Sequence, residues 1–226
     1  MRSVGRSDGR TVGLYVAALA FLSDSPTVRQ SDALAVLDRA SAAYQSVTTL
    51  SADFVQIVMN PLLGRPDTTR GELHLKRPAR FAMRFTDPAG DRVVADGRHL
   101  WLYTPSTTPG QVMRTAIPAV GTTGPNLIAQ FVEQPRERYD AKYVRADSLA
   151  SGWADVVALV PKETDLPYEE AVIWVDRSDG LLRRIEIGET TGQQRVVVLR
   201  RLRTNADVPQ REFVFRVPAG VRVVDL

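Results

Sequence analysis

The sequence predicts a mainly β domain, built as one large, curled antiparallel sheet whose concave face is covered by helices. From Leu50 onward, apolar residues recur at every second position, which is the period of a strand with one buried face. Asp-Gly pairs at Asp96 and Asp179 each separate two such segments, and this dipeptide is typical of tight hairpin turns. Because most strands follow one another without an intervening helix, the sheet is expected to be antiparallel.

Length and composition agree with a single globular domain. The 226 residues lie within the range of one all-β domain. A hydrophobic fraction of 44% and a charged fraction of 24% exclude a disordered chain, a collagen-like repeat and a membrane bundle. The absence of cysteine excludes a disulfide framework, a thiolate metal site and lipid attachment through an N-terminal cysteine.

The first 25 residues have the pattern of a secretory signal peptide. Arginines at positions 2, 6 and 10 precede an apolar run over 11–22, which is shorter than the ~20 residues that a membrane-spanning helix needs. We therefore expect residues 1–25 to be a signal peptide and 26–226 to be the exported domain, soluble and monomeric. The alternative is an uncleaved segment that anchors the chain.

The elements are expected in the following order. Ser31 and Asp32 are good N-cap residues before apolar residues at helical spacing, which predicts an amphipathic helix over 32–46. About eleven strands are expected among twelve candidate segments, which are 51–59, 70–77, 81–85, 91–95, 99–104, 111–115, 138–146, 154–160, 169–176, 181–188, 193–202 and 212–217.

A second helical segment interrupts the strands at 125–133. Pro125 suits the first position of a helix, and Pro135 follows its end. Its apolar edge consists of Leu127, Ile128, Phe131 and Val132. We expect a short helix that lies on the sheet as a lid.

Residue types that carry chemistry are sparse. Neither histidine, His74 or His99, has a second histidine or a carboxylate at metal-ligand spacing. No phosphate-binding glycine loop and no G-x-S-x-G or H-E-x-x-H motif is present. The net charge is +3, and the signal segment contributes to it, so the domain lacks the clustered cations of a nucleic-acid binder. We expect no catalytic residues, no metal and no cofactor.

The content of the concave face decides the function. A small closed barrel is filled by side chains, whereas a wider or unclosed one leaves room for an apolar ligand. The candidate wall residues are Phe54, Leu73, Leu75, Phe81, Met83 and Phe85. Each of them would also be an ordinary core residue in any β-sandwich, so that alternative stays open.

Arg77 has the same strand parity as Leu73 and Leu75, which places it on the apolar face. A buried arginine needs a hydrogen-bonding partner. The alternative is that Arg77 turns outward at the end of its strand and bonds a local carbonyl.

Several motifs resemble those of the outer-membrane lipoprotein carrier protein family, LolA. They are Leu-Lys-Arg-Pro-Ala-Arg-Phe at 75–81, Val-Ala-Asp-Gly-Arg-His-Leu-Trp-Leu-Tyr at 94–103, Leu-Ser-Ala-Asp-Phe-Val-Gln at 50–56, Gly-Glu-Leu at 71–73, and Phe-Val-Phe-Arg-Val-Pro-Ala-Gly-Val at 213–221. The resemblance covers 31–226. It departs from the family pattern at Met83, in the loop 60–69 and in the segment 104–137.

The resemblance implies an unclosed half-barrel with a helical lid over an apolar cavity. Proteins of this family take acylated lipoproteins from an inner-membrane ABC-type releasing complex and deliver them through the periplasm to an outer-membrane acceptor. It also implies a role for Arg77, because the arginine of the Lys-Arg-Pro motif is expected to bond the lid backbone and hold the empty cavity shut.

Three other functions remain open on the same fold. A periplasmic sensor of lipids or lipoproteins would usually carry a second C-terminal domain, whereas this sequence ends soon after the terminal Phe-x-Phe motif. A carrier of glycolipids would use the same cavity. An enzyme would need a converging polar cluster inside it.

Overall fold

A single twelve-stranded sheet dominates the computed structural model, which describes residues 26–62, 64–117 and 126–226. Its strands are β1 Thr49–Met59, β2 Pro66–Lys76, β3 Arg80–Asp87, β4 Ala89–Asp96, β5 His99–Tyr103, β6 Gln111–Ala116, β7 Tyr139–Leu149, β8 Gly152–Pro161, β9 Tyr168–Asp176, β10 Leu182–Glu189, β11 Gln194–Thr204 and β12 Arg222–Asp225. The helices are α1 Pro26–Gln45, α2 Ala129–Val132, α3 Pro135–Arg138 and the 3-10 turn η1 Gln210–Phe213.

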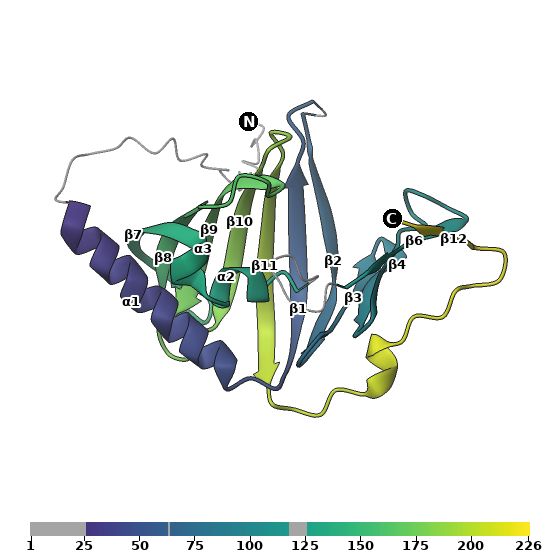
Figure 1. Ribbon diagram of the computed structural model, residues 1–226, viewed down its shortest axis with the longest axis horizontal. Helices are drawn as coiled ribbons and strands as arrows, with labels where there is room; N and C mark the ends of the chain where they lie inside the picture. The colour runs from purple at the N-terminus through teal and green to yellow at the C-terminus, as the bar shows by residue number, and fades with distance from the viewer. Residues whose placement is uncertain (1–25, 63, 118–125) are drawn as a thin grey trace, which may run out of the picture.

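The sheet is curled but unclosed (Figure 1). Its strand order is β12-β6-β5-β4-β3-β2-β1-β11-β10-β9-β8-β7, so β12 and β7 are its two edges. All neighbouring pairs are antiparallel except β12 and β6, which are parallel. The predicted half-barrel is confirmed. Eleven of the candidate strands are present as β1 to β11, and the edge strand β12 was not predicted.

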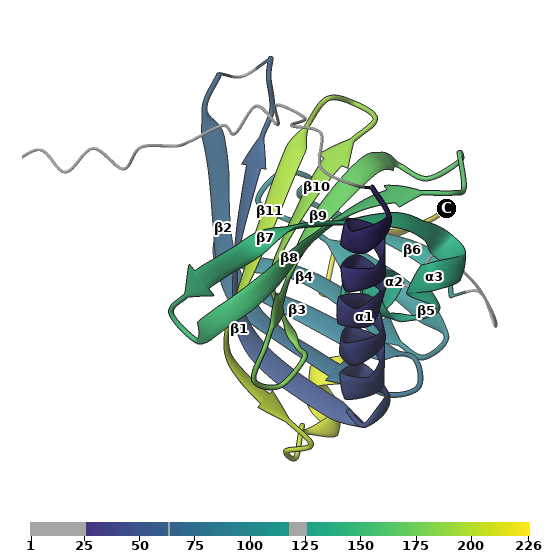
Figure 2. The same ribbon diagram turned by 90° about the vertical axis from the view of Figure 1, so that its left-hand side faces the viewer.

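The three α-helices lie together on the concave side (Figures 1 and 2). The long helix α1 runs along β7 and β8 and contacts α2 and α3. It begins before the predicted 32–46, at Pro26, and ends at Gln45. None of the helices in the described ranges is long and apolar enough to cross a membrane.

The predicted helix at 125–133 is shorter than expected. Only Ala129–Val132 is α-helical. The Asn126 side chain, which precedes this helix, accepts hydrogen bonds from the backbone amides of Ile128 and Ala129. A second helical turn, α3, was not predicted because Pro135 was interpreted as the end of a helix. In the structure Pro135 begins α3, where a missing N–H costs nothing. Pro125 and the predicted signal peptide, residues 1–25, lie outside the described residues.

The predicted strand at 212–217 was wrong. Gln210–Phe213 is a 3-10 turn, and residues 214–217 after it pair with no strand. Phe213 is nevertheless buried in a small second core on the outer face of β3 and β4, and Phe215 stacks on Trp101 with ring centroids 5.4 Å apart. The alternating sequence pattern therefore indicated an extended segment with one buried side. An extended segment can bury one side without forming hydrogen bonds to a neighbouring strand.

Candidate functional site

The concave face of β1, β2 and β3 forms a continuous apolar wall. Five of the six predicted wall residues are almost fully buried, and Phe85 is partly buried against the same cluster. Strand register explains why they share a face, since Leu73 pairs with Met83 and Leu75 with Phe81. Phe85 lies edge-on to Phe54, with ring centroids 5.1 Å apart. The sequence pattern thus located one side of a common apolar surface.

Gly71 makes room for this aromatic pair. It lies opposite Phe54 on β2, and a Cβ atom there would be 2.8 Å from the Phe54 ring and 2.1 Å from the carbonyl oxygen of Arg84. Both distances are shorter than van der Waals contact, and one of the two atoms belongs to the backbone. The glycine of the Gly-x-Leu motif is therefore required by close approach between neighbouring strands.

Two helices complete the apolar interior. The buried side of α1 consists of Ala33, Val36, Leu37, Ala40 and Tyr44. From the predicted lid segment, Ile128, Phe131 and Val132 are buried and Leu127 is partly buried. All of these residues belong to the same cluster as the sheet wall. The interior is thus bounded by the sheet on one side and by α1 and α2 on the other.

A pair of tyrosines anchors α2 through a hydrogen bond to its backbone. The hydroxyl groups of Tyr139 and Tyr168 lie 2.6 Å apart, and the Tyr139 hydroxyl donates to the Gln130 carbonyl at 2.9 Å. Arg138 donates to the same carbonyl at 2.9 Å. Burial and the bond to Tyr168 raise the pKa of Tyr139 above its ordinary value, so the phenol stays protonated.

Arg77 contacts α1, and the contact is at the end of that helix. Its Nη2 atom donates to the Tyr44 carbonyl at 2.9 Å, and its backbone amide donates to the Thr48 carbonyl at 3.0 Å. Arg77 follows the last residue of β2 and is exposed as a whole, whereas Leu73 and Leu75 are buried. The guanidinium group therefore joins the strand end to the last turn of α1.

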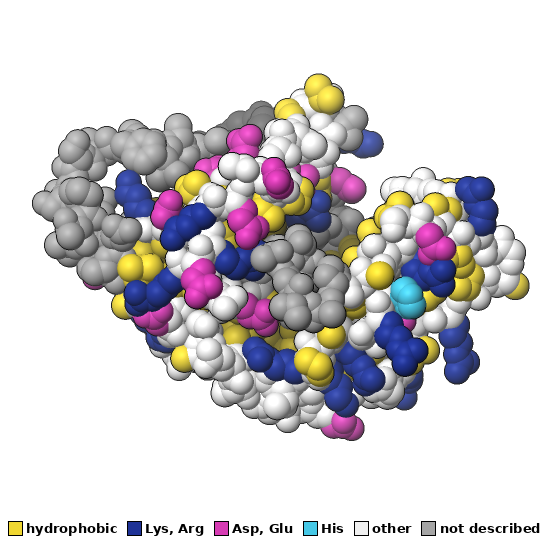
Figure 3. Space-filling model, in the orientation of Figure 1, with side chains coloured by type: hydrophobic (Ala, Val, Ile, Leu, Met, Phe, Trp, Pro, Cys, Tyr) yellow, Lys and Arg dark blue, Asp and Glu magenta, His cyan; other side chains and the backbone are white. Residues whose placement is uncertain are grey.

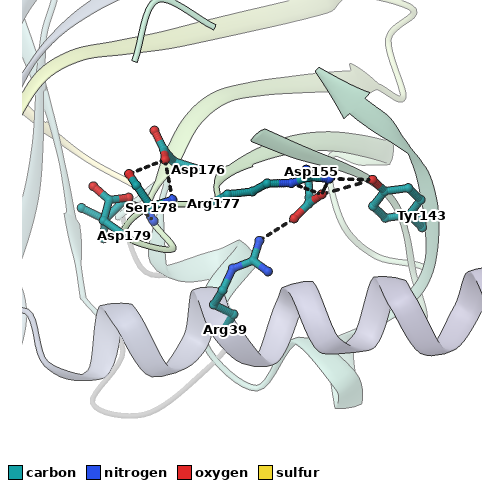
Figure 4. Close-up of polar contacts among 8 residues, drawn as sticks. Arg39, Tyr143, Asp155, Asp176, Arg177, Ser178 and Asp179 are labelled. Carbon is teal, nitrogen blue, oxygen red and sulfur yellow. Dashed lines mark hydrogen bonds and ion pairs between the residues drawn. The ribbon is translucent and has the colours of Figure 1, made fainter. Parts of the chain in front are cut away.

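A buried carboxylate on β8 joins this strand to the middle of α1 (Figure 4). Asp155 on β8 is 5% exposed. It accepts hydrogen bonds from Arg39 of α1 at 2.7 Å, from the Arg177 Nη2 atom at 2.6 Å and from the Tyr143 hydroxyl at 3.1 Å. Burial alone would raise the pKa of Asp155, but the hydrogen bonds from Arg177, Arg39 and Tyr143 outweigh it and hold the pKa below its ordinary value.

The turn between β9 and β10 packs against the same part of α1. Gly180 adopts φ of +73°, and a Cβ atom on it would lie 2.9 Å from Ala43 and 3.1 Å from the Arg39 carbonyl. Asp176, which precedes this turn, is buried and accepts from the amide and the hydroxyl of Ser178 at 2.9 and 2.6 Å (Figure 4). The predicted Asp-Gly hairpin thus also serves as a support for α1.

Sequence reasoning missed the Asp155 network and the tyrosine pair. One signal was present for the network, because Asp155 has the same parity as Val157 and Leu159 in an otherwise apolar strand. A carboxylate at such a position requires cationic or hydrogen-bonding partners. Which residues would supply them depends on the packing of α1, and no spacing in the sequence reports it.

A polar pocket of about 450 Å³ lies elsewhere, over β1, β2, β3 and β11. Most of the side chains that line it alternate with those of the apolar wall, so they belong to the outer face. Within the described ranges, no three His, Cys, Asp or Glu side chains are grouped as a metal site. His74 lies 3.7 Å from Glu72, and His99 lies against Trp101.

Comparison with known proteins identifies the family. The family model described as outer membrane lipoprotein carrier protein LolA matches residues 45–216, which is most of the chain. The chain belongs to the LolA family. The match includes the Lys-Arg-Pro segment and the apolar wall, while most of α1 precedes it.

Curated relatives agree with this assignment to the LolA family, and a solved structure shares the fold. The outer-membrane lipoprotein carrier protein of Methylobacillus flagellatus is 27% identical over 81% of this chain and 85% of its own length. That of Chromobacterium violaceum is 30% identical over 78% of this chain and 81% of its own. In fold, an uncharacterized conserved protein of Thermus thermophilus matches with a TM-score of 0.55 at 12% identity, over 86% and 99% of the two chains.

Proposed function

We propose that this protein is a periplasmic carrier that holds the acyl chains of lipoproteins between the concave face of its sheet and the helices α1 and α2. The observation that carries the proposal is the single apolar cluster that spans the sheet wall and both helices, in a chain of the LolA family. Opening the helices would expose this surface, and an acyl chain would replace the contacts that the helices make.

The energetics favour such a carrier. At ~0.8 kcal/mol for each methylene, exposure of one long acyl chain to water costs about 12 kcal/mol. Apolar burial is not directional, so it accepts chains of different length, while a few hydrogen bonds of ~1 kcal/mol each decide whether the helices are closed. Binding and release then need no catalysed reaction in the carrier itself.

We infer the route from the family. Lipoproteins would be received from an inner-membrane ABC-type releasing complex and passed to an acceptor on the outer membrane. Arg77 would act as the latch, because it bonds the last turn of α1 in the closed state. The carbonyl of Gln130 on α2 is held separately, by Arg138 and Tyr139. We therefore expect two sets of hydrogen bonds to break when the cavity is loaded.

The proposal is tested by identifying what the protein carries. We would purify it from the periplasm without detergent and analyse bound molecules by native mass spectrometry. Acylated lipoproteins are the expected ligands. Recovery of glycolipids instead, or of no acylated molecule, would contradict the proposal.

A matched pair of variants tests the location of the site. Phe85→Arg places a charge at the partly buried end of the apolar wall, and Thr86→Arg places the same charge on the exposed neighbouring residue. We expect the first variant to lose bound lipoprotein and the second to retain it, with both folded by circular dichroism. Equal capture by the two variants would place the chains elsewhere.

A further inference from the structure

The strand ends beside the C-terminus of α1 carry a row of cationic side chains, which we call the basic rim. Its members are Lys76, Arg77, Arg80, Arg98 and Arg203. Strand register places them together: Lys76 pairs with Arg80 and with Thr49, Arg80 pairs with Asp96 just before the turn that holds Arg98, and Arg203 pairs with Ser51. They come from β2, β3, the β4–β5 turn and β11.

The basic rim crosses five neighbouring strands, β11, β1, β2, β3 and β4. At about 4.8 Å between strands, this corresponds to a row about 20 Å long. Figure 3 shows Lys and Arg side chains gathered along the lower edge of the molecule, where these strands end. Because Arg77 contacts the last turn of α1, the row lies at the same end of the apolar interior as that helix end.

The charges of the basic rim are not neutralised by ion pairs. Most arginines elsewhere in the sheet pair with a carboxylate, as in Arg84–Glu72, Arg114–Asp225, Arg145–Asp147, Arg183–Asp179 and Arg195–Glu189. Within the described ranges, none of the five rim cations forms an ion pair. Arg77 and Arg80 instead bond neutral groups, the Tyr44 carbonyl and the Gln210 side chain.

Four carboxylates lie within four residues of a rim cation or of Gln210, which bonds Arg80: Glu72, Asp96, Asp207 and Glu212. Glu72 pairs with Arg84, and Glu212 pairs with Arg211. Asp96 is occupied locally, because it accepts hydrogen bonds from the amides of Arg98 and His99 and from the Trp101 indole, each at 2.8 Å. Asp207 is exposed, three residues after the end of β11. In the described structure only Asp96 and Asp207 of these four have no cationic partner, so the five rim cations leave a positive surface.

The form of this surface favours a lipid headgroup layer over a protein partner. Protein interfaces are centred on buried aromatic or aliphatic anchors in a shaped pocket. The large apolar side chains that are exposed in the described structure, Leu62, Trp153, Val160, Val214, Val217 and Leu226, do not belong to the strands and turns that form the basic rim. Long, separate guanidinium groups in a row instead match phosphates that are laterally mobile.

We propose that the basic rim is a docking surface for anionic phospholipid headgroups. Docking would orient toward a membrane the end of the apolar interior that lies beside the C-terminus of α1. Guanidinium groups bind phosphate oxygens with paired, charge-assisted hydrogen bonds. The contact is electrostatic, so it weakens with salt and allows the carrier to leave the membrane. This surface is separate from the apolar interior, and the proposal does not require that interior to carry lipoproteins.

The test measures binding of the full exported chain to vesicles. Vesicles of phosphatidylcholine with phosphatidylglycerol are compared with phosphatidylcholine alone, by co-sedimentation over a series of salt concentrations. We expect binding that depends on phosphatidylglycerol and falls as salt rises. Absence of binding at low salt, or equal binding to neutral vesicles, would overturn the proposal.

The decisive variant is Arg98→Glu with Arg203→Glu, since both side chains are exposed and neither forms a side-chain bond in the described structure. At about 1 kcal/mol for each cation near the surface, loss of two cations weakens binding about 30-fold, and reversal of their charge weakens it further. The matched control is Arg65→Glu with Arg92→Glu, which changes the net charge equally at exposed positions away from the basic rim. Equal loss in both double variants would show that only net charge matters, and the basic rim would be rejected.

Lipoprotein capture separates this proposal from the carrier function. The Arg98, Arg203 double variant should retain acylated lipoproteins as the wild type does. Vesicle binding without lipoprotein capture in the wild type would reject the carrier function and leave the docking surface supported. Lipoprotein capture without vesicle binding would reject the docking surface alone.

Discussion

Arg77 bonds α1 in its last turn. The last four carbonyl groups of a helix lack partners inside it, and the helix dipole places partial negative charge there. The Tyr44 carbonyl is one of these groups, since α1 ends at Gln45, and it already accepts a hydrogen bond from the Val47 amide at 3.1 Å. The Arg77 guanidinium at 2.9 Å is therefore a second donor to this oxygen, and its positive charge complements the negative end of the helix dipole.

Substitution of this arginine tests its role as a latch. Arg77→Leu removes the bond to α1 and adds apolar surface near the interior, which favours the open, loaded state over the empty one. We expect the variant to keep bound lipoprotein but fail to release it. Transfer from loaded protein to acceptor membranes, measured by immunoblotting of the lipoprotein, checks this.

Arg65→Leu is the control, because it removes the same charge from an exposed position at the other end of β2. It should transfer lipoprotein as the wild type does. Normal release by Arg77→Leu would show that Arg77 is not the latch.

Asp155 is a residue whose charge state affects stability. Its folded pKa lies below the ordinary value of 3.8, so its hydrogen bonds stabilise the fold above that pH and are lost as the pH falls through the folded pKa. We expect Asp155→Asn to lower the free energy of unfolding by about 2 kcal/mol at pH 7. The difference from wild type should stay constant down to about pH 5 and shrink below 3.8.

Urea unfolding at a series of pH values measures this difference. Asp140→Asn is the control, since Asp140 is exposed and lies 3.8 Å from its partner Lys162. Exposed pairs of this kind contribute about 0–1 kcal/mol. A difference for Asp155→Asn that does not change with pH would mean that its carboxylate is not the source of the stabilisation.

Among the elements, α1 and α2 are held differently. The long helix α1 is bonded in its middle, through Asp38 to Arg136 and Arg39 to Asp155, and at its end, through the Tyr44 carbonyl to Arg77. The four-residue helix α2 is too short to persist without packing. Its Gln130 carbonyl is the group through which Tyr139 and Arg138 hold it.

Hydrogen exchange tests α2 as the mobile lid. The amides of 129–132 should exchange faster than those of β3, and Tyr139→Phe should speed their exchange about fivefold by removing one hydrogen bond of about 1 kcal/mol. Tyr143→Phe removes a hydroxyl from the Asp155 network instead and should leave α2 unchanged. Equal, deep protection of α2 and β3 in the wild type would contradict a mobile lid.

At the scale of the whole molecule, the chain after β11 crosses the outer face and returns to the far edge of the sheet. Asn205 bonds Thr48 beside the start of β1, Phe213 fills the outer core on β3 and β4, and β12 pairs with β6. We expect this segment to stabilise the curl of the open sheet, because it contacts strands from the centre of the sheet to its edge.

Truncation of one anchor measures this contribution. Phe213 is 1% exposed, so Phe213→Ala should lower the free energy of unfolding by about 3 kcal/mol or more through the cavity that it creates. Val214→Ala, at an exposed neighbouring position, should change it by less than about 0.5 kcal/mol. Similar effects of both substitutions in urea unfolding would show that the outer core contributes little.

The sequence by itself determined the sheet and its apolar face. Side chains alternate between the two faces along every strand, so the period-two pattern of β2 and β3 directly indicates which residues are buried. Asp-Gly indicates a hairpin because few other residues adopt the backbone conformation that a tight hairpin turn requires. The motifs around Lys-Arg-Pro also determined the family, which residues 45–216 match. Local rules suffice for these features because each depends on residues that are neighbours in the chain or in one hairpin.

Only the tertiary structure decided how the helices are held. The carbonyl that Arg77 bonds is 33 positions away, and Asp155 meets Arg39 across 116 positions. Likewise, the pattern of 212–217 could not distinguish a strand from an extended segment packed on the outer face. These contacts depend on how elements that are distant in the sequence pack against one another. Hydrophobic packing determines those positions, and because it is not directional it leaves no periodic signal in the sequence.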